Sequence, residues 1–190
     1  MNAGKKLRLF YLFFVCILLV SCKSSEEETS ADDRLSEFYG TFKGAAESVI
    51  GGELSERELT VVIKPWEEDK GFTIEWTTEI YRSNGKDKYT DMAINFYPSQ
   101  RPNIYLSALR TDIFGKAVPH NPGEEDQPYV WAGMEGNTLT VSALYIVDGG
   151  GYELQVYERS SIEEGLLLQF ERLSNGEKVA EISALLKRVE

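Results

Sequence analysis

Residues 72–80 read FTIEWTTEI, and this stretch decides the fold class of the chain. Apolar Phe72, Ile74, Trp76 and Ile80 fall on alternate positions, with polar residues between them. A period of two is typical of a β-strand that buries one face and leaves the other in water. The stretch therefore predicts a strand of an antiparallel sheet, with Trp76 on its apolar face.

The same period recurs on both sides of this stretch. It predicts ten strands, around residue 42 and over residues 59–63, 72–80, 92–96, 104–108, 130–134, 139–143, 152–156, 166–170 and 179–189. A short helix is expected over 32–38, before the first strand. The aliphatic positions are expected to face inward, which places Tyr105, Tyr129 and Trp131 outside or at a rim. The chain is thus predicted to be all-β.

The connections between the predicted strands are those of hairpins. Asn84-Gly85 and Asn175-Gly176 are preferred pairs for tight turns that need positive φ at both central residues. Short, regular spacing of hairpins favours a meander, and ten strands leave costly open edges unless the sheet closes. We therefore predict an antiparallel up-and-down β-barrel of about ten strands, with a β-sandwich as the alternative.

In architecture this pattern resembles the calycin group, the lipocalins and fatty-acid-binding proteins. Their first strand carries Gly-x-Trp, and a late Arg lies across that Trp. Here Gly40-Thr41-Phe42 stands in the first position, and Arg172 or Arg188 can supply the late cation. The resemblance implies a lipocalin-like barrel over 38–190 that holds a small apolar or amphipathic ligand.

The first residues carry an export signal. Residues 5–8 include three basic side chains, residues 9–20 form an apolar run too short to span a bilayer comfortably, and residues 19–22 read LVSC. This resembles the bacterial lipoprotein signal, which implies cleavage after residue 21 and acylation of Cys22 with chains of the palmitate kind. Several acyl chains make a durable membrane anchor.

The resemblance also implies where the protein is located, and the residues after the leader predict a tether. Lys23 after the acylated residue, where the inner-membrane retention signal has Asp, implies an outer-membrane lipoprotein that faces the periplasm. Residues 22–37 are acidic and poor in apolar side chains, which predicts a flexible tether. The predicted organisation is a signal peptide over 1–21, the tether over 22–37 and the barrel over 38–190.

Composition excludes several kinds of chemistry. The net charge is −11, and removal of residues 1–21 would leave 17 basic against 31 acidic residues, which argues against nucleic acid as a partner. Cys16 and Cys22 both lie in or next to the leader, and His120 is the one histidine, so neither a thiolate nucleophile nor a multi-histidine metal site is expected. No nucleophile-elbow, phosphate-loop or zinc-protease motif occurs. We predict no catalytic residue, no metal and no cofactor.

The candidate ligand-binding residues are Arg110, Phe114, Trp76 and Arg172. Residues 111–128 form the longest connection, which is long enough to fold across an open barrel end, with Phe114 as a lid residue. Arg110 and Arg172 continue the apolar faces of their strands, as strand-end residues or as inward cations for an anionic head group. His120 with a nearby carboxylate is either an acid–base pair or part of a solvated, proline-stiffened loop.

The sequence therefore predicts a membrane-anchored, non-enzymatic binder of a small apolar or amphipathic ligand, such as a lipid. The alternative is a filled barrel whose acidic exterior binds or inhibits a basic protein of the cell envelope. An enzyme is the third option.

Overall fold

The computed structural model describes residues 31–50, 53–66, 71–82, 85–108, 110–111, 117–118 and 128–189. Strands dominate these ranges. The elements are α1 (Ala31–Ser36), β1 (Gly40–Ile50), β2 (Glu53–Trp66), β3 (Gly71–Arg82), β4 (Lys88–Pro98), β5 (Ile104–Ser107), β6 (Arg110–Thr111), β7 (Ala117–Val118), β8 (Tyr129–Glu135), β9 (Thr138–Ile146), the 3₁₀ turn η2 (Asp148–Gly150), β10 (Tyr152–Ile162), β11 (Gly165–Ser174) and β12 (Glu177–Arg188).

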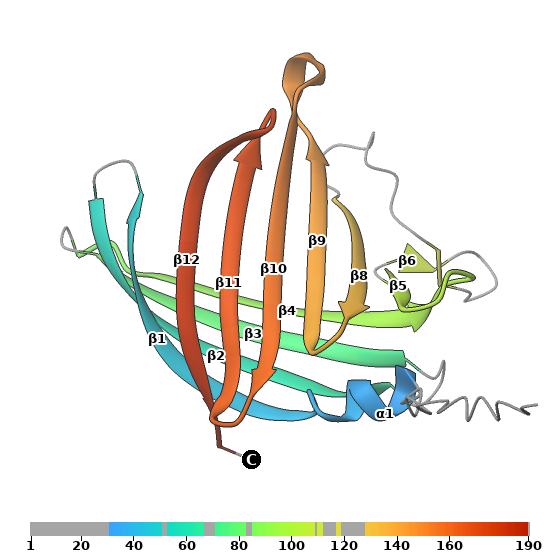
Figure 1. The fold of residues 1–190 in the computed structure, drawn as a ribbon. Helices are drawn as coiled ribbons and strands as arrows, with labels where there is room; N and C mark the ends of the chain where they lie inside the picture. Colours follow the sequence, from blue (N-terminus) through green and yellow to red (C-terminus); the bar gives the residue numbers. More distant parts are fainter. Residues whose placement is uncertain are drawn as a thin grey trace, which may run out of the picture.

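The main sheet is a closed barrel with strand order β1-β12-β11-β10-β9-β8-β5-β4-β3-β2 (Figure 1). Apart from β6 and β7, which pair only with each other, each strand lies beside the strands before and after it in the chain, and the pairs are antiparallel. These ten strands are the ten that the sequence predicts. The predicted up-and-down barrel is confirmed, and the β-sandwich is not the observed fold.

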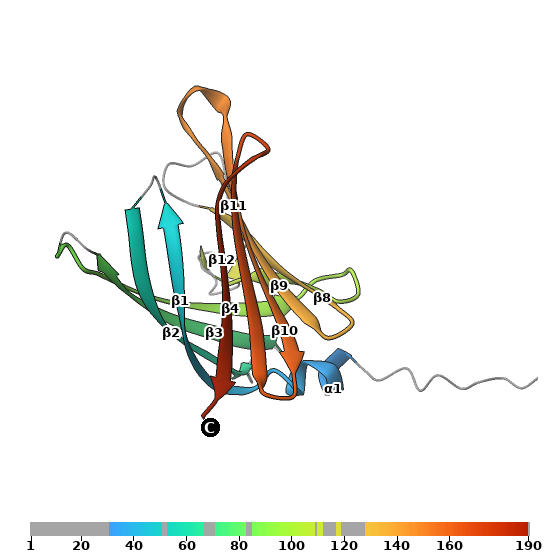
Figure 2. The same ribbon diagram turned by 60° about the vertical axis from the view of Figure 1, so that its left-hand side comes forward.

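The barrel is built from two sheets joined along two short seams. At one seam, β1 pairs with β12 through Phe42 with Arg188 and Lys43 with Lys187. At the other, the four-residue strand β5 bridges β4 and β8. In Figure 1, β3 and β4 run across the view while β9–β12 stand upright, and Figure 2 shows β1 turning up beside β12. The ladder is therefore continuous but narrow at the seams, which leaves room between the sheets.

One end of the barrel is filled with side chains. Leu35 of α1 and Phe38 are fully buried there, and α1 lies at the same end of the barrel as the turn between β10 and β11 (Figure 1). The ring of Phe72 stacks on Phe96 and meets the edge of Tyr105, both at 5.0 Å between centroids. Each of these buried side chains contributes about 1.5 to 3 kcal/mol of transfer free energy. We call this the closed end.

The cation that the calycin resemblance implies is Arg188 rather than Arg172. Its guanidinium carbon lies 4.5 Å from the centroid of the Phe42 ring. The same side chain donates hydrogen bonds to the carbonyl oxygens of Tyr39 and, at 2.8 Å, of Glu37. Arg188 therefore ties the last strand to the first and to the segment that follows α1.

The predicted hairpin turn at Asn175-Gly176 is confirmed. Both residues have positive φ, 50° and 87°, which is the geometry that a two-residue primed turn requires. Gly85 also has positive φ, at 70°, while Asn84 lies outside the described residues.

The predicted inner face of β10 is wrong. Leu154 and Val156 point outward, and Tyr157 and Arg159 point inward, because Tyr157 pairs with buried Val141 of β9 and Arg159 pairs with buried Leu139. The outward apolar side chains continue a half-buried outer surface, where Leu154 pairs with Leu144 of β9 and Leu173 of β11. The apolar alternation within β10 therefore marks its half-buried outer face, and only the pairing with β9 and β11 shows which face is inside.

The side chain of Tyr105 is also inside, not outside. It is 4% exposed and packs on Phe72, while Ile104 and Leu106 are half-buried on the outer face. Tyr129 and Trp131 do lie on the face opposite Val130 and Ala132, as expected. Strand β5 is too short for its own alternation to override pairing with β4 and β8.

The buried core includes a residue from the segment that precedes the predicted barrel. Helix α1 covers Ala31–Ser36, and its Leu35 belongs to the core. The expected short helix is therefore present and packs as part of the barrel. The rest of the predicted tether, and Cys22, lie outside the described residues.

Candidate ligand cavity

A cavity of about 390 Å³ lies between the two sheets, toward the barrel end away from α1. Its apolar wall comes from both sheets. That wall consists of Leu59 and Val61 of β2, Trp76 and Ile80 of β3, Leu168 and Phe170 of β11, and Ala180 and Ile182 of β12. The volume is within the range of about 300 to 1,000 Å³ that is typical of small-molecule sites.

Five cations line the same cavity. They are Arg57 of β2, Arg82 of β3, Lys88 of β4, Arg159 of β10 and Arg172 of β11. None of the described residues that line it is Asp, Glu or His. In a chain of net charge −11, the cavity is therefore basic while the protein as a whole is acidic.

Arg159 is the most deeply buried of these cations, with 2% of its surface exposed. Its Nη1 donates to the carbonyl oxygen of Tyr157 at 3.5 Å, and its Nε has no partner. Burial lowers the pKa of Arg159 to about 10, so the side chain is still charged at neutral pH. Removing a cation from water costs several kcal/mol unless an opposite charge compensates it, and no carboxylate of the described residues pairs with Arg159.

Arg57, Arg82 and Arg172 form a second group, toward the barrel end opposite the closed end, which we call the open end. Arg57 donates from Nε to Ser48 Oγ at 2.9 Å. Burial, and then repulsion from Arg82 and Arg172, lower the pKa of Arg57. The Nε of Arg172 is buried without a partner. An anion placed among these three guanidinium groups would relieve their mutual repulsion.

An aromatic wall separates the two groups of cations. The ring of Tyr157 lies 4.7 Å from Phe170 and 6.0 Å from Trp76, measured between centroids. Its hydroxyl donates to Gln155 Oε1 at 3.0 Å, and Gln155 donates in turn to Glu153 at 2.7 Å. Burial raises the pKa of Tyr157 to about 12, which keeps the phenol neutral. The middle of the cavity thus suits an apolar or planar part of a ligand.

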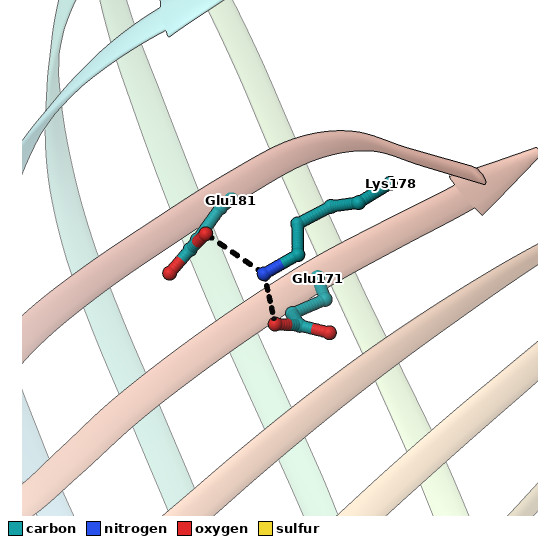
Figure 3. A network of polar contacts seen from close by, with 3 residues as sticks. All are labelled: Glu171, Lys178 and Glu181. Atoms are coloured by element: carbon teal, nitrogen blue, oxygen red, sulfur yellow. Dashed lines mark hydrogen bonds and ion pairs between the residues drawn. The ribbon is translucent and has the colours of Figure 1, made fainter.

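Cations on the outer face are paired differently. Lys178 Nζ lies between Glu171, at 2.7 Å, and Glu181, at 2.9 Å (Figure 3). These two carboxylates raise the pKa of Lys178. Lys64 likewise pairs with Glu75 on the outside. Carboxylates form ion pairs with these outer cations, whereas among the described residues no carboxylate pairs with the guanidinium group of an arginine that lines the cavity, although Asp87 accepts a hydrogen bond from the backbone nitrogen of Arg82.

Two of the four predicted ligand-binding residues, Trp76 and Arg172, line this cavity. The backbone of Arg110 lies in β6, paired with Val118 of β7, and its side chain is outside the description. Phe114 and His120 lie outside the described residues, so their roles stay predictions. The sequence analysis missed Arg57 and Arg159. Arg57 precedes the apolar alternation of its strand, and Arg159 lies on the face of β10 that the alternation did not favour.

The described residues contain no cluster of His, Cys, Asp and Glu able to hold a metal ion. They also contain no helix with the length and hydropathy needed to cross a membrane.

Strand order and cavity together define the class, a closed up-and-down β-barrel with an internal cavity of ligand size. No protein-family model matches the chain, and no curated protein matches it. Among solved structures, the chain is similar to the S-type phycobiliprotein lyase CPES of Guillardia theta. The sequence identity is 12%, the match covers 86% of this chain and 94% of that chain, and the TM-score is 0.38. With a similarity this low, the fold assignment rests on the strand order of this chain itself.

Proposed function

We propose that the barrel binds a small amphipathic anion in the cavity between its sheets. The observation that carries this proposal is the set of five cations, without a carboxylate among the described lining residues, around an aromatic and aliphatic wall. Hydrogen bonds to a charged group contribute about 1.5 to 3 kcal/mol each, and burial of the apolar part adds to them.

The test is binding of a fluorescent fatty acid to the purified protein, with displacement by unlabelled decanoate. Arg172→Met should weaken binding about ten- to hundredfold. The matched control is Arg101→Met, since Arg101 is an exposed side chain in the connection between β4 and β5. Absence of binding to the unmutated protein would contradict the proposal, as would equal losses in both variants.

The alternative function, recognition of a basic envelope protein, has one supporting observation. The outer face of β1–β3 gathers carboxylates, because Glu47 pairs with Glu56 and Glu58 pairs with Glu79. Binding of a cationic partner at this surface should be lost in a Glu56→Gln, Glu58→Gln double variant and unchanged in Arg172→Met. The cavity proposal predicts the opposite pattern for the fatty acid.

The proposal includes the anchor that the leader predicts. Residues 19–22 support acylation of Cys22 and an outer-membrane, periplasm-facing location. Replacing Cys22 with Ser should abolish incorporation of labelled palmitate and leave the uncleaved precursor, as followed by gel mobility. Normal labelling of that variant would remove Cys22 as the lipidation site.

A further inference from the structure

The cations of the cavity lie at two depths. Arg159 of β10 pairs with Leu168 of β11, near the closed end, where Leu166 and Leu186 are fully buried. Arg172 lies four residues beyond Leu168 along β11. At about 3.3 Å per residue, the two rows are about 13 Å apart. Arg172 thus belongs to the open end and Arg159 to the deep end.

The two positions also differ in their cationic neighbours. Repulsion from Arg82 and Arg172 lowers the pKa of Arg57, which places these three in one group, whereas among the described residues no other cation acts on the pKa of Arg159; Tyr157 acts on both Arg57 and Arg159. The rings of Tyr157 and Phe170 lie between the two positions, 4.7 Å apart. A single small anion at the open end would therefore leave Arg159 buried without a counter-charge.

Each position shows an unmet hydrogen-bonding capacity of its own. The Nε of Arg159 and the Nε of Arg172 are both buried without a partner. Such donors are rare in folded proteins, since a buried polar group without a partner costs about 1 to 3 kcal/mol. Both belong to side chains that line the same cavity.

We propose that the ligand is a dianion, with an acidic group at each end of an apolar or planar middle part. This inference rests on the proposed function and names its ligand class. One carboxylate or phosphate meets Arg159 at the deep end, and the other lies among Arg57, Arg82 and Arg172. The middle part packs on the aromatic wall of Trp76, Tyr157 and Phe170.

The experiment compares decanedioate with decanoate by isothermal titration of the purified protein. The two probes have the same chain length and differ in the second carboxylate. Decanedioate should bind at least about tenfold more tightly, because one more charged contact is made. Hexanedioate, which is too short to reach both positions, should lose this advantage.

Variants at the two depths then assign the contacts. Arg159→Met and Arg172→Met should each lower the affinity for decanedioate about ten- to hundredfold, whereas decanoate should lose affinity in one of the two variants only. Arg159→Lys keeps the charge and should retain part of the preference for the dianion. Circular dichroism checks that each variant is folded, and Arg101→Met should bind both probes as the unmutated protein does.

The experiment distinguishes failure of the dianion proposal from failure of the proposed function. Equal affinity for decanoate and decanedioate, or an Arg159→Met variant that binds decanedioate normally, would overturn the dianion and leave the cavity as a binding site. Failure of the unmutated protein to bind either probe would overturn the proposed function and the dianion with it.

Discussion

Arg159 shows what the proposed ligand site costs in stability while it is empty. It is almost fully buried, its Nε has no partner, and no carboxylate of the described residues compensates its charge. Replacing buried charges with apolar side chains of similar volume is often neutral or stabilising, by up to about 4 kcal/mol. The same change removes the deep anchor for an anion. Replacing Arg159 with an apolar side chain is therefore expected to raise the stability of the ligand-free protein and to lower its affinity for an anion.

The first prediction follows from this opposition. Arg159→Met should raise the melting temperature of the ligand-free protein, by about 2 to 4 °C for each kcal/mol gained in a chain of this size. Differential scanning calorimetry without ligand measures it, and Arg101→Met is the control with no expected change. A lower melting temperature for Arg159→Met would mean that the guanidinium stabilises the empty barrel.

The second prediction concerns pH. The affinity for decanedioate should be constant between about pH 6 and 9, since the described lining residues include no His, Asp or Glu and the pKa of Arg159 is about 10. An anion binds the protonated guanidinium, so affinity is complete below that pKa and falls as the pH rises through it. Titration calorimetry across this range tests the sign. A tenfold change between pH 6 and 8 would indicate a titrating group outside the described cavity.

Trp76 and Arg172 could be predicted because each continues the apolar alternation of its own strand. In β11, Leu166, Leu168, Phe170 and Arg172 share the inward face, as their spacing indicates. Arg159 could not be predicted this way. Its neighbours on the inward face, Gln155 and Tyr157, are polar, so nothing local marks that face as the inside. Only pairing with the apolar inner faces of β9 and β11 decides it.

Among the strands, the start of β3 is a position where only glycine fits. A Cβ on Gly71, the first residue of β3, would lie 1.8 Å from the carbonyl oxygen of Phe96 in β4. This close approach lets β3 begin directly against β4, where Phe72 stacks on Phe96. The sequence signals a turn at this glycine but not the backbone contact, which joins residues 25 positions apart along the chain.

The third prediction tests that contact. Gly71→Ala should destabilise the barrel by about 1 to 3 kcal/mol, because the backbone of β4 must move to admit the methyl group. Gly133→Ala is the matched control, since its Cβ would meet Ile104 Cδ1 at an ordinary 3.5 Å. Urea unfolding compares the two variants. Equal stability of both would show that β3 and β4 separate at little cost.

At the scale of the whole barrel, the described residues that line the cavity include cations and no carboxylate, whereas Lys64 and Lys178 on the outer face are paired with carboxylates. The barrel also has two distinct ends, because α1 and the fully buried Leu35 and Phe38 fill one while the cavity lies toward the other. Ten strands and their closure follow from periodicity and turn residues. The cavity does not, since it depends on which side chains of β2, β3, β10, β11 and β12 face one another inside the barrel, which no local pattern encodes.

The last prediction gives the barrel an orientation on the membrane. If Cys22 is acylated, eight residues connect it to Ala31 at the closed end, and as the tether that their composition predicts they would reach about 16 Å. The cavity then faces away from the bilayer. Glu164 lies in the β10–β11 turn, at the same end of the barrel as α1, and Asp148 lies in the connection between β9 and β10 at the opposite end (Figure 1). The eleven residues of β10 separate these two connections by up to about 36 Å.

A dye attached to Glu164→Cys should therefore transfer more energy to an acceptor in the lipid than a dye on Asp148→Cys. If the leader is removed after residue 21 and Cys22 carries lipid, as predicted, the labelling is selective, because the introduced cysteine is then the one free thiol of the processed chain. The control is a leaderless form of each variant mixed with the same vesicles, which should show no transfer. Equal transfer from both sites in the anchored form would mean that the barrel tumbles freely on its tether and that the cavity has no fixed direction relative to the membrane.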